Sequence, residues 1–189
     1  MTRRNVIVGA AAGIASAGVF LPGGPAAATR VGCRAPQWAI TQWINGNPGN
    51  VDTLSGKVVV IDFFQLWCPG CNSFSGPLIS EWQQTFADEI SDGRLVLVKI
   101  HTVFEGRSVQ TVERLKTYIV EKDITLPVGV DAHVEGQRLP VTMKRYATRG
   151  TPEMAVIDRD GIIRFQKFGF FEPVPVEAMI RDLMGRRRA

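Results

Sequence analysis

The chain contains few of the residues that bind metals or cross-link small folds. Three cysteines and two histidines occur among its 189 residues. A structural zinc site needs about four such ligands, usually as two close pairs or as a pair with nearby histidines. Here one pair, Cys68 and Cys71, is accompanied only by scattered single residues, which are Cys33, His101 and His133. The sequence therefore predicts no metal site, and a fold that buries its core without disulfide cross-links.

The chain also lacks a long hydrophobic run and a concentrated charge. Its most apolar stretch, Val6–Phe20, has about 15 residues and is rich in glycine, whereas a membrane-spanning helix needs ~20 apolar residues. The formal net charge is +4, and the basic residues are dispersed apart from those at 186–188. With 45% apolar and 21% charged residues, the composition is typical of one globular domain and gives no indication of nucleic-acid binding.

The N-terminal segment has the features of an export signal. Arg3 and Arg4 precede the glycine-rich and alanine-rich stretch, and residues 26–28 are small, as signal peptidase requires. This pattern resembles a twin-arginine signal. We expect a signal peptide over residues 1–28, a flexible segment with the odd Cys33 over 29–37, and one domain over 38–189, located outside the cytoplasm. An uncleaved N-terminal anchor is the alternative.

The centre of the chain combines a strand, two cysteines and a helix. The run Val58–Phe64 is apolar and β-branched without polar alternation until Asp62, which is typical of a central strand covered on both faces. Cys68 and Cys71 follow it. Aromatic and aliphatic residues then recur every four positions and predict a helix with one buried face, at Phe74, Leu78, Trp82 and Phe86.

This order indicates redox chemistry at the cysteine pair. A cysteine at a helix N-terminus faces unpaired backbone N–H groups and the positive end of the helix dipole, and both favour its thiolate. We therefore expect Cys68 to be the nucleophile and Cys71, one turn later, to attack a mixed disulfide on Cys68. A purely structural disulfide is the weaker alternative, because so short a loop adds little stability.

Asp62 is anomalous in a strand buried on both faces. An ionised carboxylate there costs several kcal/mol unless it is paired, so the group tends to remain protonated. We expect it to exchange protons with Cys71. The alternative is a structural pairing with a lysine such as Lys99 or a loop-capping role.

The rest of the chain predicts a βαβ unit followed by a hairpin. Its strands are parallel and adjacent, which places Cys68 at their C-terminal edge. His101 lies near that edge and His133 in a loop, and both are expected to face solvent. The expected elements are a loop at 38–50, strands at 95–100 and 126–131, a helix at 107–121, a helical turn at 139–146, a hairpin within 150–164 and a helix at 174–184.

Two segments resemble the thioredoxin superfamily, and with the export signal they are most similar to its extracytoplasmic TlpA/ResA-type branch. The first is Asp62–Cys71, in which a strand ending in Asp-Phe leads into Trp-Cys-x-x-Cys, and the second is Gly150-Thr151-Pro152. The resemblance implies an α/β thioredoxin-like fold with a central mixed sheet flanked by helices. It also implies that Pro152 is cis and faces the cysteines.

The resemblance further implies a substrate surface and a helix kink. The substrate surface is expected to consist of Trp67, Pro69, Gly70, Thr151 and Pro152. In most members a helix proline follows the second cysteine by five residues. Here Pro77 follows Cys71 by six, so the geometry of this helix stays open.

The implied activity is that of an exported thiol-disulfide oxidoreductase acting on protein or cytochrome thiols. Such an enzyme needs no cofactor besides its own disulfide, and an extracytoplasmic membrane redox partner recycles it. One alternative is a thiol peroxidase, although Ile61 and Gln65 occupy the positions where peroxiredoxins carry proline and threonine or serine. Another is a copper-binding module that adds Met143 or Met154 to the thiolates, although the chain has no methionine-rich cluster.

Overall fold

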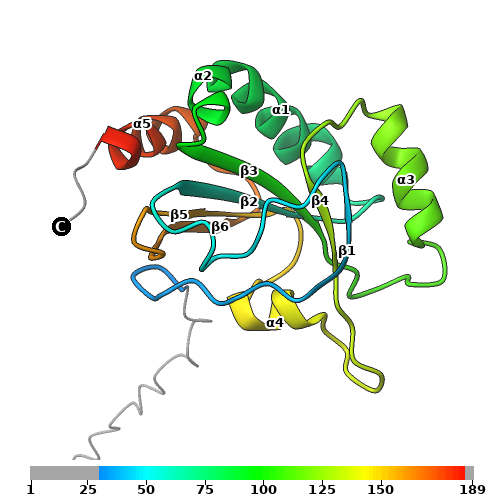
Figure 1. The fold of residues 1–189 in the computed structure, drawn as a ribbon. Coiled ribbons are helices and arrows are strands. Elements are labelled where there is room, and N and C mark those ends of the chain that lie inside the picture. Colours follow the sequence, from blue (N-terminus) through cyan, green and yellow to red (C-terminus); the bar gives the residue numbers. More distant parts are fainter. Residues whose placement is uncertain (1–29, 186–189) are drawn as a thin grey trace, which may run out of the picture.

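The computed structural model describes residues 30–185, so the predicted signal peptide lies outside the described residues (Figure 1). Six strands form one mixed sheet in the order β1-β4-β3-β2-β5-β6. The strands are β1 (Ile40–Ile44), β2 (Val58–Phe64), β3 (Leu95–His101), β4 (Val128–Asp131), β5 (Glu153–Ile157) and β6 (Ile163–Phe168). The helical segments are η1 (Cys71–Ser75), α1 (Gly76–Thr85), α2 (Ala87–Ser91), α3 (Val112–Glu121), α4 (Val141–Tyr146) and α5 (Pro173–Gly185).

Strand β2 lies at the centre of the sheet, and all seven of its residues are buried. It runs parallel to β3 and antiparallel to β5. A strand with neighbours on both sides and helices over both faces has no solvent-exposed side, which explains its continuous apolar run. The α/β fold with a mixed central sheet that the resemblance implied is confirmed.

The two faces of the sheet are covered by different helices (Figure 1). One face packs against α1 and α5 in a cluster that includes Val60, Trp82 and Ile180, and the other packs against α4 through Tyr146. Because side chains alternate along a strand, Asp62 of β2 lies on the same face as Val60. The four-residue spacing identified the buried face of α1 correctly, since Leu78, Trp82 and Phe86 are all buried. Phe74, which lies in η1 just before α1, is partly buried and packs against the same cluster.

Two elements of the structure differ from the sequence predictions, namely β1 and the start of α3. The segment 38–50, predicted as a loop, contains β1, which pairs antiparallel with β4 at the edge of the sheet. The helix predicted from 107 begins at Val112, where the side chain of Thr111 accepts a hydrogen bond from the backbone N–H of Arg114. Residues 103–110 instead form a loop beside the cysteines. None of the described helices combines the length and apolar character needed to cross a membrane.

The hairpin of β5 and β6 is confirmed, and one carboxylate organises its turn. Asp158 Oδ1 accepts hydrogen bonds from the backbone N–H groups of Asp160 and Ile162, both at 2.9 Å. Its Oδ2 pairs with Arg164. Burial favours the neutral carboxyl, but these hydrogen bonds and the guanidinium outweigh it and lower the pKa of Asp158.

Candidate active site

Cys68 and Cys71 form a disulfide directly after β2, at the C-terminal edge of the parallel strands. The Cys68 residue is 6% exposed and Cys71 is 1% exposed, so the first cysteine is the more accessible of the two. The backbone N–H of Cys71 donates to Cys68 Sγ at 3.1 Å. This donor belongs to the first turn of the helical segment, where a negative charge on sulfur is stabilised.

The helix after the cysteines begins with a π-helical turn, η1. The backbone N–H of Gly76 donates to the carbonyl of Cys71, five residues earlier. Such a turn holds one residue more than an α-helical turn, which accounts for the six-residue gap between Cys71 and Pro77. Pro77 therefore lies at the start of α1, directly after this turn.

The Thr151–Pro152 peptide bond is cis, as the resemblance implied. The sheet brings it to the cysteines because Glu153, the next residue, is paired with Phe63 of β2. The two segments touch at Gly70, where an added Cβ would lie only 2.9 Å from Cδ of Pro152. A side chain at position 70 would force these segments apart, so glycine is required for this close approach.

Asp62 pairs with Lys99, the alternative that the sequence left open. Both side chains are almost completely buried, with 0% and 2% exposure. Lys99 Nζ also lies 4.6 Å from the centroid of the Phe64 ring. The second carboxylate oxygen of Asp62, Oδ1, has no hydrogen-bond partner among the described residues.

A cavity of about 190 Å³ is lined by Cys71 and by Lys99, the partner of Asp62. Ser80, Gln83 and Lys122 are among its other lining residues. Tyr118 also lines the cavity and donates to Asn72 Oδ1 at 3.1 Å. Burial, reinforced by the nearby Asp62 carboxylate, raises the pKa of Tyr118 to about 12.

The prediction that His101 faces solvent is wrong. Its side chain is 1% exposed, and its ring lies 5.4 Å from the Phe64 ring. Burial lowers the pKa of His101 to about 4, and a side-chain hydrogen bond with Gln110 only partly offsets this effect. The imidazole is therefore neutral at physiological pH and belongs to the core beside the active site.

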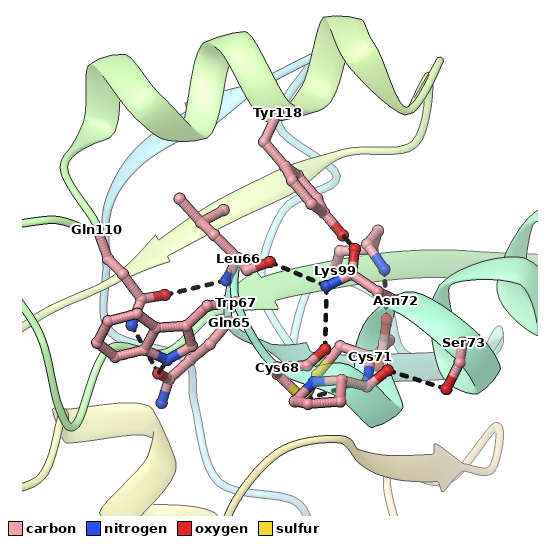
Figure 2. Close-up of a disulfide and its surroundings, with 12 residues drawn as sticks. Gln65, Leu66, Trp67, Cys68, Cys71, Asn72, Ser73, Lys99, Gln110 and Tyr118 are labelled. Carbon is pink, nitrogen blue, oxygen red and sulfur yellow. Dashed lines mark hydrogen bonds and ion pairs between the residues drawn. A yellow bond between two sulfur atoms is a disulfide. The ribbon is translucent and has the colours of Figure 1, made fainter.

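Sequence reasoning also missed a group of amide side chains around the Cys68 turn (Figure 2). Gln110 Oε1 accepts from the backbone N–H of Leu66 at 2.9 Å. On the other side, Asn72 Nδ2 donates to the carbonyls of Leu66 and Cys68, at 2.9 and 3.0 Å. The only signal in the sequence was Gln65, a long polar residue directly after an apolar strand.

The surface around the disulfide is aromatic. Trp67 is 49% exposed and Phe170 is 66% exposed. The Phe170 ring packs 4.9 Å from that of Phe74 in η1, and Pro69 is exposed beside Cys68. Of the predicted substrate-surface residues, Trp67 and Pro69 are exposed, Gly70 and Thr151 are partly buried, and Pro152 is buried. The remaining cysteine, Cys33, is free and exposed in the described part of the chain.

Metal-binding candidates do not gather at this site. Among residues 30–185, no group of three or more His, Cys, Asp or Glu side chains is placed to hold a metal ion. Met143 and Met154, the thioether candidates of the copper hypothesis, are both buried.

Comparisons with known proteins agree with this geometry. The AhpC/TSA family matches residues 31–166. Among solved structures, the thioredoxin-like superfamily protein SPOA0173 is 35% identical with a TM-score of 0.76, covering 82% of this chain and 99% of its own. A thiol-disulfide isomerase from Corynebacterium glutamicum is 35% identical with a TM-score of 0.71, covering 81% of this chain and 98% of its own.

A longer relative matches over part of its length. Protein DipZ of Mycobacterium bovis is 28% identical over 149 residues, which are 77% of this chain and 20% of DipZ. This chain thus spans about a fifth of that relative. The chain belongs to the AhpC/TSA family, and it has the fold and the cysteine pair of thioredoxin-like thiol-disulfide oxidoreductases.

Proposed function

We propose that this thiol-disulfide oxidoreductase reduces disulfides of exported proteins or cytochromes through attack by Cys68 and resolution by Cys71. The observation that carries the proposal is the asymmetry of the pair. Cys68 is the more exposed cysteine, and its sulfur accepts the N–H of Cys71 at 3.1 Å. That donor stabilises a thiolate on Cys68, which is the nucleophilic form.

The disulfide exchange needs no cofactor, because the two cysteines supply the two electrons that the substrate gains. The Cys68 thiolate forms a bond to one substrate sulfur and breaks the substrate disulfide, whose other sulfur leaves as a thiolate and takes up a proton. Cys71 then loses its proton, attacks Cys68 Sγ and releases the second substrate sulfur as a thiol. Two electrons pass to the substrate, and the enzyme retains the Cys68–Cys71 disulfide. A membrane redox partner outside the cytoplasm would reduce it again.

Asp62 is the group we assign to the proton of Cys71. Lys99 binds the Asp62 carboxylate and lines the same cavity as Cys71. The cavity is large enough for several water molecules, which would carry a proton between the pair, the thiol and solvent. We expect Asp62→Asn to slow resolution of the mixed disulfide by about a hundredfold, the lower end of the range for general acid-base catalysis.

Thr151 and Pro152 would hold an extended substrate segment beside Cys68. Pro152 has no N–H, and packing against Gly70 fixes its position beside the cysteine loop. The backbone of Thr151 would then pair with the substrate, while Trp67 and Pro69 contact its side chains. The twin-arginine pattern at Arg3 and Arg4 supports export of the enzyme.

Trapping tests the assignment of the two cysteines. A Cys71→Ser variant, incubated with an oxidised protein such as insulin, is expected to accumulate a mixed disulfide that mass spectrometry locates at Cys68. The matched Cys68→Ser variant is expected to form almost none, because Cys71 is buried. Trapping through Cys71 instead would overturn the assignment.

The reduction potential tests the direction of the reaction. Equilibration with dithiothreitol buffers, followed by thiol counting, is expected to give a value near or below the roughly −270 mV of thioredoxin. A value near the roughly −120 mV of strong disulfide oxidants would identify an oxidant instead.

The AhpC/TSA match makes thiol peroxidase activity the second candidate. In the structure, the Gln65 side chain binds other side chains and Ile61 lies within β2. We therefore expect no rapid oxidation of Cys68 by low hydrogen peroxide. Second-order oxidation much faster than that of free cysteine would favour the peroxidase.

A further inference from the structure

Two buried glutamines hold the tryptophan that precedes the nucleophilic cysteine (Figure 2). Gln65 Oε1 accepts from Trp67 Nε1 at 3.0 Å and from Gln110 Nε2 at 2.6 Å. Gln65 is 1% exposed and Gln110 is 5% exposed, so both amides are shielded from water. The hydrogen bond between Gln65 and Gln110 is buried, and such a bond is costly to break because the freed donor finds no solvent.

Gln110 also fixes the backbone on both sides of the tryptophan ring. Its Oε1 accepts from the N–H of Leu66, and its Nε2 donates to the carbonyl of Glu105, each at 2.9 Å. One amide therefore connects the active-site turn to the loop at 103–110. These two segments lie far apart in sequence.

The loop at 103–110 supports one face of the Trp67 ring. An added Cβ at Gly106 would lie 1.9 Å from Cη2 of the indole, so the ring rests directly on the glycine backbone. Trp67 nevertheless remains 49% exposed. It is thus fixed on one side by Gly106 and at its N–H by Gln65, and the rest of its surface is free for a partner.

A hollow of about 280 Å³ lies beside the fixed ring. Leu66, Trp67, Val109 and Gln110 line it together with Arg114. Val109 is 43% exposed. Arg114 forms no ion pair with any residue between 30 and 185. The hollow offers an apolar wall and one cation next to the residue that precedes Cys68, which suits a side chain of a polypeptide rather than a small thiol.

We propose that Gln65 and Gln110 are positioning residues that hold Trp67 as a pre-ordered docking surface for polypeptide substrates. The inference rests on the proposed function. Ordering a mobile aromatic side chain during binding weakens affinity, and the two amides remove that cost before the substrate arrives. A small disulfide touches only Cys68 and gains nothing from the arrangement.

The test compares a protein disulfide with a small one. Gln110→Leu keeps the approximate volume of the side chain and removes both hydrogen-bonding groups. With insulin as the protein substrate and dithiothreitol as the reductant, we expect KM to rise about 5- to 30-fold, as the loss of one or two buried hydrogen bonds predicts. kcat, the reduction potential and the rate with 5,5′-dithiobis(2-nitrobenzoate) should change less than about twofold, because the chemistry at Cys68 is untouched. The control Gln84→Leu changes an exposed glutamine on α1 and should alter none of them.

A second pair of variants acts on the ring without removing an amide. Gly106→Ala pushes the indole away, and its matched control Gly136→Ala has a similar positive φ, +77° against +63°, with no atom within 4 Å of the added Cβ. We expect the KM increase for Gly106→Ala only. A shifted Trp67 indole N–H signal in NMR spectra would show that each substitution has moved the ring. If the KM for insulin is then unchanged in both Gln110→Leu and Gly106→Ala, the inference is overturned.

Two other outcomes are equally informative. An equal loss of rate with the small disulfide would also overturn the inference, because the amides would then act on Cys68 itself. Wild-type protein that reduces neither insulin nor the small disulfide would instead refute the proposed function.

Discussion

His101 makes the stability of the protein depend on pH in a defined direction. Its buried ring packs against Phe64, and its Nε2 has no hydrogen-bond partner within the described part of the chain. Burial lowers the pKa of His101 from 6.5 to about 4 despite the hydrogen bond with Gln110. The folded state therefore binds a proton less readily than the unfolded state does.

The magnitude follows from the two pKa values. The difference between 6.5 and about 4 corresponds to roughly 3 kcal/mol in the free energy of unfolding. Above pH 6.5 the histidine is neutral in both states and this stabilisation is fully present. As pH falls from 6.5 to 4, the unfolded chain binds a proton that the folded protein excludes, and the stabilisation is lost.

The contribution of His101 has to be separated from those of other buried groups. Burial raises the pKa of Asp131 and of Glu153, and hydrogen bonds lower it only in part. These carboxyls therefore stabilise the folded protein as pH falls, which is opposite to the effect of His101. A His101→Gln variant removes the imidazole and leaves the carboxyls of Asp131 and Glu153 to titrate as before.

Urea unfolding of the wild type and of His101→Gln between pH 7 and pH 4 measures the effect. Over this range the unfolding free energy of the wild type is expected to fall by roughly 3 kcal/mol relative to that of His101→Gln. NMR titration gives a direct value, because the chain has two histidines and the variant identifies the His101 signal. Parallel stability curves, or a His101 pKa near 6.5, would refute the reasoning.

Three further predictions concern stability and are measured by urea unfolding. Lys99→Met should cost about 3 to 5 kcal/mol because it leaves the buried Asp62 unpaired; the double variant with Asp62→Asn should recover most of the loss, and no recovery would contradict the pairing. Leu115→Ala should cost about 2 to 5 kcal/mol, since Leu115 is 0% exposed in the cluster around the cysteines; a loss below 1 kcal/mol would mean that α3 packs loosely. Asp158→Ala should cost about 1 to 3 kcal/mol through two orphaned N–H groups, and the wild-type advantage should diminish as pH falls and Asp158 becomes protonated.

The parts of the fold that follow from local chemistry could be predicted from the sequence. Val58–Phe64 has the β-branched run of a central strand. The Asp-x-Asp-Gly turn after Ile157 specifies a tight hairpin between β5 and β6. Strand β1 was missed because only its pairing with β4 makes an extended strand of Ile40–Ile44.

The polar surroundings of the site were harder to predict than the cysteines. His101 and Gln110 are polar residues near a strand end and in a loop, and local pattern alone assigns such residues to the surface. They are buried because the loop at 103–110 folds back over the Cys68 turn. Such a contact between distant segments has no period or motif in the sequence.

The π-helical turn after Cys71 has a consequence for register. Each residue inserted into an α-helix rotates everything after it by about 100°, which would have turned Leu78 and Trp82 away from the sheet. The turn at Cys71–Ser75 absorbs the extra residue within five positions. The chain between the second cysteine and the core face of α1 can thus differ by one residue in length while both ends keep their places. A related structure in which the helix proline follows the second cysteine by only five residues is therefore expected to superimpose on this one at Cys71 and along α1. It should differ only in the turn between them.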